Sequence, residues 1–86
     1  MPEIARFYGI IIKMYYRDHA PPHFHAEYGE HELLITISPI GVFEGHAPPR
    51  VRSMVLEWCA LHQAELADNW TRCRTGNKPV VVAPLE

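Results

Sequence analysis

The stretch "HFHAEYGEHELLITI", residues 23–37, decides the fold, because its alternation predicts an antiparallel hairpin in a single register. Gly29-Glu30 separates two runs, and glycine first suits a two-residue type II′ turn that pairs Tyr28 with His31. A slip by one residue would bury the charged side chains and expose the aromatic ones. The predicted core face carries Phe24, Ala26, Tyr28, Leu33, Ile35 and Ile37, with His31 at its tip. The predicted polar face carries His23, His25, Glu27, Glu32, Leu34 and Thr36.

The residues before the hairpin predict another strand of the same sheet. Residues 10–17 alternate, with the even positions apolar and therefore facing inward. Antiparallel pairing with residues 23–28 would place ionisable and hydroxyl side chains of both strands on one patch. That patch consists of Lys13, Tyr15, Arg17, His23, His25 and Glu27. Two shorter strands, at 4–8 and 42–44, are expected to flank this unit.

The second half of the chain has helical periodicity. Pro48-Pro49 suits the first turn of a helix, and an apolar stripe at helical spacing follows. The stripe consists of Val51, Met54, Val55, Trp58 and Leu61. It then shifts phase to Leu66, Trp70 and Cys73, which predicts a break within 62–64 and a second helix to about Arg74, stopped at Gly76. The tail at 80–82 is expected to form an edge strand or an ordered arm.

Together these patterns predict an α+β fold, in which a small antiparallel sheet of three to five strands packs against two C-terminal helices. The chain has 86 residues, which suits a single domain over 1–86. Its β-rich half is expected over 1–47 and its helical half, with a short tail, over 48–86. Association into a homodimer would add stability to so small a core.

Composition limits the classes of function. The formal net charge is −2, so no global basic surface directs the chain to nucleic acid. Cys59 and Cys73 form no CxxC pair and are expected to pack as reduced thiols, as in a cytoplasmic protein. The apolar run at 9–12 is far too short to span a bilayer, so no membrane partner is expected.

Three motifs cover nearly the whole chain. They are "PEIARFYG" at 2–9, "DHAPPHFHAEYG" at 18–29 and "LEWCALHQAELADNW" at 56–70. By these motifs the chain closely resembles the small prokaryotic family named domain of unknown function 4160. The resemblance implies no defined activity. Members of that family look like short reading frames encoded beside another small protein, which is similar to toxin-antitoxin modules and implies a small protein partner encoded nearby.

One interpretation of the polar patch is a metal site, with zinc or iron as the cofactor. His23 and His25 are two residues apart on a strand, so their side chains point the same way with Cα atoms about 7 Å apart. Glu27 on the same face, Glu32 across the hairpin or His19 from the loop would be the third ligand. Two histidines and one carboxylate with open positions suit iron(II), and a closed tetrahedral set suits zinc.

A second interpretation is an endoribonuclease that needs no metal and no other cofactor. Histidine serves as acid or base near neutral pH, and fixed cations stabilise the charge that develops on phosphate. His23 or His25 would then transfer protons, Arg17 and Lys13 would hold the phosphate, and Tyr15 would stack on a base or share in proton transfer. Glu27 and Glu32 oppose this hypothesis, because carboxylates repel phosphate.

A third interpretation is a non-catalytic interaction domain or the regulatory partner of such a module. Polar residues fill the wet face of many strands, and Asp18 with Pro21-Pro22 would simply make a rigid turn in which the carboxylate accepts backbone N–H bonds. His46 is expected in a loop and His62 at a helix end. The leading hypothesis is a component of a toxin-antitoxin-type module that cleaves or binds RNA at the patch, and the other two remain open.

Overall fold

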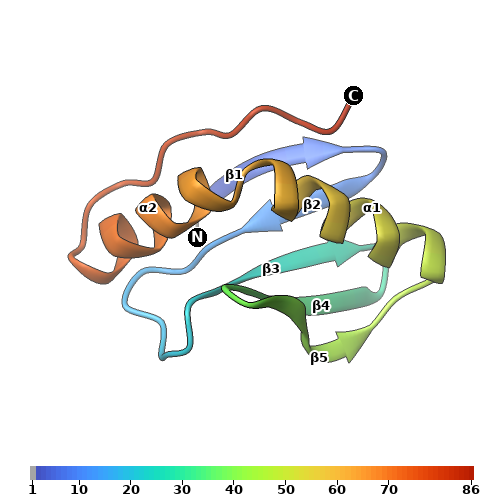
Figure 1. The fold of residues 1–86 in the computed structure, drawn as a ribbon, viewed down its shortest axis with the longest axis horizontal. Helices are drawn as coiled ribbons and strands as arrows, with labels where there is room; N and C mark the ends of the chain where they lie inside the picture. Colours follow the sequence, from blue (N-terminus) through green and yellow to red (C-terminus); the bar gives the residue numbers. More distant parts are fainter. Residues whose placement is uncertain (1) are drawn as a thin grey trace.

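The computed structural model describes residues 2–86 and confirms the α+β class. A five-stranded antiparallel sheet with the strand order β1-β2-β3-β4-β5 is followed by two helices, α1 (Pro49–Leu61) and α2 (Gln63–Arg74) (Figure 1). The strands are β1 (Glu3–Phe7), β2 (Ile10–Lys13), β3 (His23–Tyr28), β4 (His31–Ile37) and β5 (Ile40–His46). Each strand therefore pairs with its neighbour in sequence, as local hairpins dictate.

The central hairpin has the predicted register. Tyr28 pairs with His31 and Phe24 with Ile35, and Gly29 adopts a φ of 57°, as the first position of a type II′ turn requires. The ring of His31 stacks on Tyr28 at the tip, with the centroids 6.5 Å apart. Alternation thus set both which face is buried and which residues are opposite each other.

Two strand boundaries were predicted wrongly. β2 ends at Lys13 and not at Arg17, because the chain leaves the sheet: Arg17 has a φ of 54°, and its N–H donates to the Cys73 carbonyl at 3.2 Å. That bond joins residues far apart in sequence, so no local sequence pattern predicted it. β5 is longer than the predicted strand at 42–44 and includes His46, which was expected in a loop.

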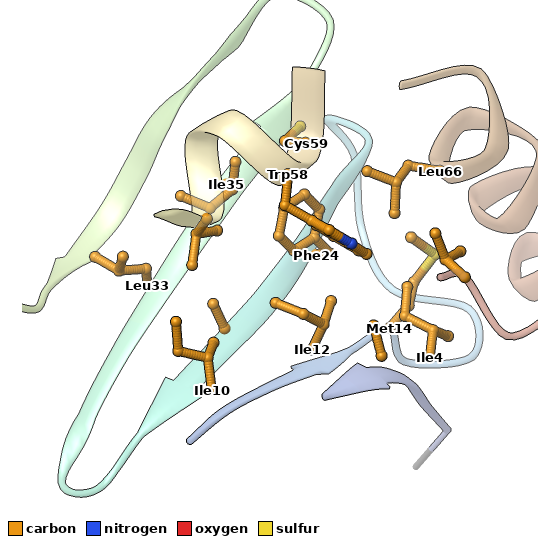
Figure 2. Packing of buried hydrophobic residues seen from close by; sticks show 14 of the residues in the cluster. Ile4, Ile10, Ile12, Met14, Phe24, Leu33, Ile35, Trp58, Cys59 and Leu66 are labelled. Atoms are coloured by element: carbon orange, nitrogen blue, oxygen red, sulfur yellow. The ribbon is translucent and has the colours of Figure 1, made fainter. Parts of the chain in front are cut away.

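The core lies between one face of the sheet and the helices (Figure 2). Trp58 of α1 is fully buried, and its ring lies 5.4 Å from Phe7 and 5.6 Å from Phe24 between centroids. α2 contributes the predicted shifted stripe. Its buried apolar residues are Leu66, Trp70 and Cys73. In α1 the stripe prediction fails at Leu61, which is 65% exposed because the helix ends there.

The helical half breaks at the predicted place. His62 lies between α1 and α2, and its N–H donates to the Trp58 carbonyl at 3.1 Å. α2 ends at Arg74, and Gly76 follows with a φ of 83°, the left-handed conformation that glycine adopts readily after a helix. Among residues 2–86, no helix combines the length and the apolar character needed to cross a membrane.

The C-terminal tail is an ordered arm rather than an edge strand (Figure 1). Asn69 of α2 is buried, and its side-chain amide donates to the Val80 carbonyl and accepts the Val80 N–H, both at 2.8 Å. Beyond it, the Val82 N–H donates to the Ile4 carbonyl, and the Trp58 indole donates to the Ala83 carbonyl. The arm thereby covers the outer edge of β1.

Candidate functional site

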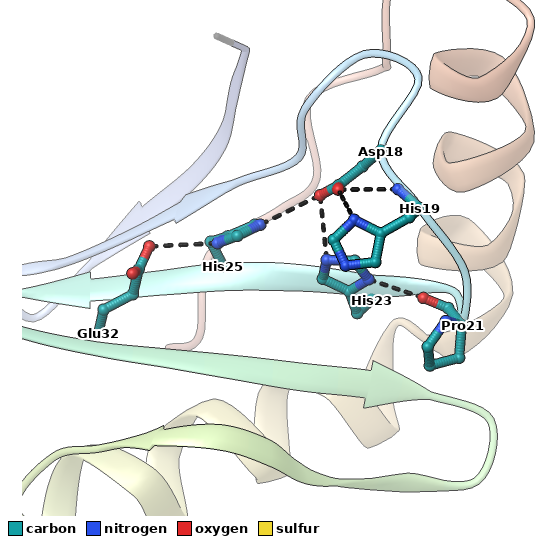
Figure 3. A network of polar contacts seen from close by, with 6 residues as sticks. All are labelled: Asp18, His19, Pro21, His23, His25 and Glu32. Carbon is teal, nitrogen blue, oxygen red and sulfur yellow. Dashed lines mark hydrogen bonds and ion pairs between the residues drawn. The ribbon is translucent and has the colours of Figure 1, made fainter.

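The loop between β2 and β3 brings a carboxylate onto the first residues of β3 (Figure 3). Oδ2 of Asp18 lies 3.0 Å from Nε2 of His23 and 3.3 Å from Nε2 of His25. One ligand atom from each of these three residues lies within 4.8 Å of the other two. We call Asp18, His23 and His25 the Asp-His-His cluster.

The Pro21 carbonyl orients the ring of His23. Its Nδ1 lies 2.7 Å from that oxygen, and because a carbonyl only accepts, Nδ1 must carry the proton of this hydrogen bond. In a ring with one proton, Nε2 then presents a lone pair toward Asp18. Nε2 is buried and makes no hydrogen bond, although it lies 3.0 Å from Oδ2.

His23 is far more buried than its predicted place on a wet strand face suggested. Its side chain is 1% exposed, and its ring centroid lies 5.2 Å from that of Trp70 on α2. The prediction that His23 lies on a solvent-exposed strand face is therefore wrong. His23 is the first residue of β3, and α2 contacts its ring there. A periodicity within one strand carries no information about a helix that packs over its end.

His25 is oriented in the same way by a carboxylate. Nδ1 of His25 lies 3.1 Å from Oε2 of Glu32 across the hairpin, and Nε2 lies 3.3 Å from Oδ2 of Asp18, so the ring is held between two carboxylates. In the tautomer in which Nδ1–H donates to Glu32, Nε2 presents a lone pair on the side of Asp18. The ring of Tyr15 packs edge-on against His25 with the centroids 4.4 Å apart. Burial and then the nearby Glu27 and Glu32 carboxylates raise the pKa of Tyr15, so its hydroxyl stays protonated at neutral pH.

The two oxygens of Asp18 have different partners. Oδ1 accepts the His19 backbone N–H at 2.8 Å and lies 3.0 Å from Nδ1 of the exposed His19 ring, while Oδ2 faces the other two histidines. Burial opposes ionisation of this carboxyl, but the His19 N–H and the histidine rings outweigh it and lower the pKa of Asp18. The carboxylate is therefore ionised at neutral pH.

The other predicted site residues are only partly brought together. Lys13 pairs with His25 in the sheet register, but its ammonium forms an ion pair with Glu27 at 3.0 Å. The hydrogen bond that Lys13 donates to Glu27 raises the pKa of Lys13. The Arg17 guanidinium lies instead against Gly76, just beyond α2. Lys13, Tyr15, His25 and Glu27 thus share the polar face, whereas Arg17 does not.

Sequence reasoning missed Asp18 as a member of this cluster. The expected turn role is real, since Oδ1 accepts the His19 N–H, but Oδ2 also faces two rings five and seven residues further along the chain. The signal available was the motif "DHAPPHFH", in which an acidic residue and two histidines flank a proline pair that must reverse the chain.

A comparison with protein-family models matches residues 9–71 to the domain of unknown function (DUF4160). The chain belongs to this family. The matched region contains every residue of the Asp-His-His cluster together with Glu32. No curated protein and no solved structure gives a significant match to the chain.

Proposed function

We propose that this protein binds one divalent transition-metal ion through Nε2 of His23, Nε2 of His25 and Oδ2 of Asp18. The observation that carries the proposal is Nε2 of His23, a buried polar atom with no hydrogen-bond partner that lies 3.0 Å from a carboxylate oxygen. Buried polar atoms without partners are rare because they lose the solvation that water gave them. A cation held between the nitrogen and the carboxylate would satisfy both.

The outer contacts of both histidines support a metal over a simple ion pair. In each ring Nδ1 lies within hydrogen-bond distance of an oxygen acceptor, the Pro21 carbonyl for His23 and the Glu32 carboxylate for His25. Histidines that ligate metals commonly donate their second ring N–H in this manner, which fixes the tautomer and the ring orientation. Two rings prepared in the same way, and facing one carboxylate oxygen, favour a shared ion.

The separations also suit metal ligands. Metal bonds to histidine and carboxylate of about 2.1 Å place neighbouring ligand atoms roughly 3.0–3.4 Å apart in octahedral or tetrahedral geometry. The contacts from Oδ2 of Asp18 are 3.0 and 3.3 Å. The two histidine nitrogens lie at most 4.8 Å apart, and small rotations of the rings would shorten this distance to the same range.

The donor set indicates the class of metal. Two imidazole nitrogens and one carboxylate oxygen suit zinc, iron(II) and their neighbours in the first transition row, whereas magnesium and calcium prefer sites made of oxygens alone. The free thiols of Cys59 and Cys73 are not in the cluster. Relative to the ligand set predicted from the sequence, the carboxylate of this proposal is Asp18, while Glu27 is engaged with Lys13.

The geometry favours metal binding over metal-independent RNA cleavage. Phosphate chemistry of that kind needs free cations around the histidines. Lys13 is neutralised by Glu27, Arg17 is turned toward Gly76, and the partners of His25 are carboxylates, which would repel phosphate. A role in a toxin-antitoxin-type module, with a small protein partner, stays a prediction from the family resemblance.

The decisive experiment is metal analysis of protein without a histidine tag, since a tag would bind the same ions. Chelator-treated protein is loaded with zinc, cobalt(II) or, without oxygen, iron(II), dialysed, and analysed by elemental mass spectrometry. One ion per chain is expected for the wild type, and far less for Asp18→Asn and His25→Ala. Glu27→Gln and His46→Ala are matched controls outside the cluster and should retain the ion. Equal metal content in all five proteins would contradict the proposal.

A further inference from the structure

We infer that the metal centre leaves at least one coordination position open for a small anion, so that it is a centre of the reactive type rather than a closed structural one. The inference rests on the proposed function. Structural zinc sites have four protein ligands, and reactive ones have three and an exchangeable position. The question is therefore whether the chain can supply a fourth ligand atom.

Asp18 contributes a single oxygen. Its Oδ1 already accepts the His19 backbone N–H at 2.8 Å and faces the His19 ring at 3.0 Å. Chelation of the ion by both oxygens would weaken these contacts within the loop. Asp18 is thus arranged as a ligand through Oδ2 alone.

The neighbouring carboxylates are occupied elsewhere. Glu32 accepts from Nδ1 of His25, and moving it to the metal would leave that ring unoriented. Glu27 forms the ion pair with Lys13. Within residues 2–86, the group of histidine, cysteine, aspartate and glutamate side chains able to share an ion consists of Asp18, His23 and His25.

His19 is the remaining alternative for a fourth ligand. Its side chain is 80% exposed, and its Nδ1 contacts Oδ1 of Asp18, the carboxylate oxygen that does not face the other histidines. In this position His19 orients the ligand Asp18 and lies outside the set of three. We therefore assign it as a positioning residue for Asp18.

Charge and access favour an anion at the open position. A divalent ion on one carboxylate and two neutral imidazoles keeps one net positive charge, which attracts anions and makes a bound water more acidic. The side chains of Asp18 and His25 are 15% and 13% exposed, whereas His23 is closed off by Trp70. Solvent and small ligands thus reach the ion from the side of Asp18 and His25.

The test uses full-length, tag-free protein loaded with cobalt(II), whose visible absorption reports coordination number, and azide as the anion. Azide should shift the absorption saturably in the wild type. In His19→Ala the shift should persist, with a Kd for azide within about threefold of the wild type, because the variant keeps all three ligands. Asp18→Asn should give no protein-bound cobalt spectrum.

Two results would overturn the inference, and they are distinguishable. A strong four-coordinate cobalt spectrum that ignores azide in the wild type, but changes in His19→Ala, would make His19 the fourth ligand and leave the proposed metal binding intact. No protein-bound cobalt in the wild type, under conditions where circular dichroism shows a folded chain, would remove the proposed function and this inference with it.

Discussion

Nε2 of His23 and Oδ2 of Asp18 lie 3.0 Å apart in a buried position without forming a hydrogen bond. Because Nδ1 of His23 donates to the Pro21 carbonyl, a ring with one proton keeps a lone pair on Nε2, beside an ionised oxygen. Two lone pairs at this distance repel, and the fold holds them together through the loop and the end of β3. Either a second proton on the ring or a cation relieves that repulsion, and the latter is the basis of the proposed metal site.

Asp18→Asn separates metal binding from folding. The amide can donate to Nε2 of His23, so the metal-free variant should be as stable as the wild type or more stable by about 1 kcal/mol. Zinc at a thousand times its Kd should stabilise the wild type by about 4 kcal/mol and the variant by almost nothing. Urea denaturation with zinc or with a chelator measures both quantities. Equal stabilisation of the two proteins by zinc would count against the site, and Glu27→Gln serves as the control.

Most of the fold was predictable because its information is local. The turn at Gly29-Glu30 and the alternation around it set the central hairpin, and the phase shift of the apolar stripe located the break at His62. The first hairpin turn was visible only in part. The strand predicted at 4–8 ended before Gly9, but Tyr8 also has a positive φ, 49°, which the residue type did not predict.

The site was less predictable because its contacts cross elements. Strand alternation placed Lys13, His25 and Glu27 on one face correctly. It could not show that Trp70 buries His23, that Arg17 turns toward Gly76, or that a nine-residue loop carries Asp18 back over two histidines. Each of these depends on where α2 and the loop pack, which only tertiary structure defines.

Leu66 and Leu61 form a matched pair for testing the packing of the helical half. Leu66 of α2 is fully buried and Leu61 at the end of α1 is 65% exposed, although the two residues are only five positions apart in sequence. Leu66→Ala should lower the free energy of unfolding by about 2–5 kcal/mol, since it opens a cavity in the core. Leu61→Ala should change it by less than about 0.5 kcal/mol. Urea denaturation of both variants checks the difference, and similar losses would show that the end of α1 packs differently.

Asn69 is expected to anchor the C-terminal arm. Asn69→Ala removes both hydrogen bonds to Val80 and should destabilise the protein by about 1–3 kcal/mol, because the N–H and the carbonyl of Val80 lose their partners in the buried Asn69 side chain. The Val82 amide, which bonds to Ile4, should exchange its hydrogen faster in the variant. Asn77→Ala, at an exposed position, is the control. Unchanged exchange at Val82 in Asn69→Ala would mean that other contacts hold the arm.

At alkaline pH the free energy of unfolding should depend on the ionisation of the buried Cys59 thiol. Burial raises the pKa of Cys59 from 9.0 to about 11, so the folded state retains this proton after the unfolded chain has lost it. The resulting stabilisation is fully present below pH 9 and is lost as the pH rises through about 11. The free energy of unfolding, from urea denaturation at pH 8 and 10.5, should therefore fall further in the wild type than in Cys59→Ala, which lacks the titrating group. A parallel loss in both proteins would assign the alkaline destabilisation to other residues and would imply that the Cys59 thiol is accessible to solvent.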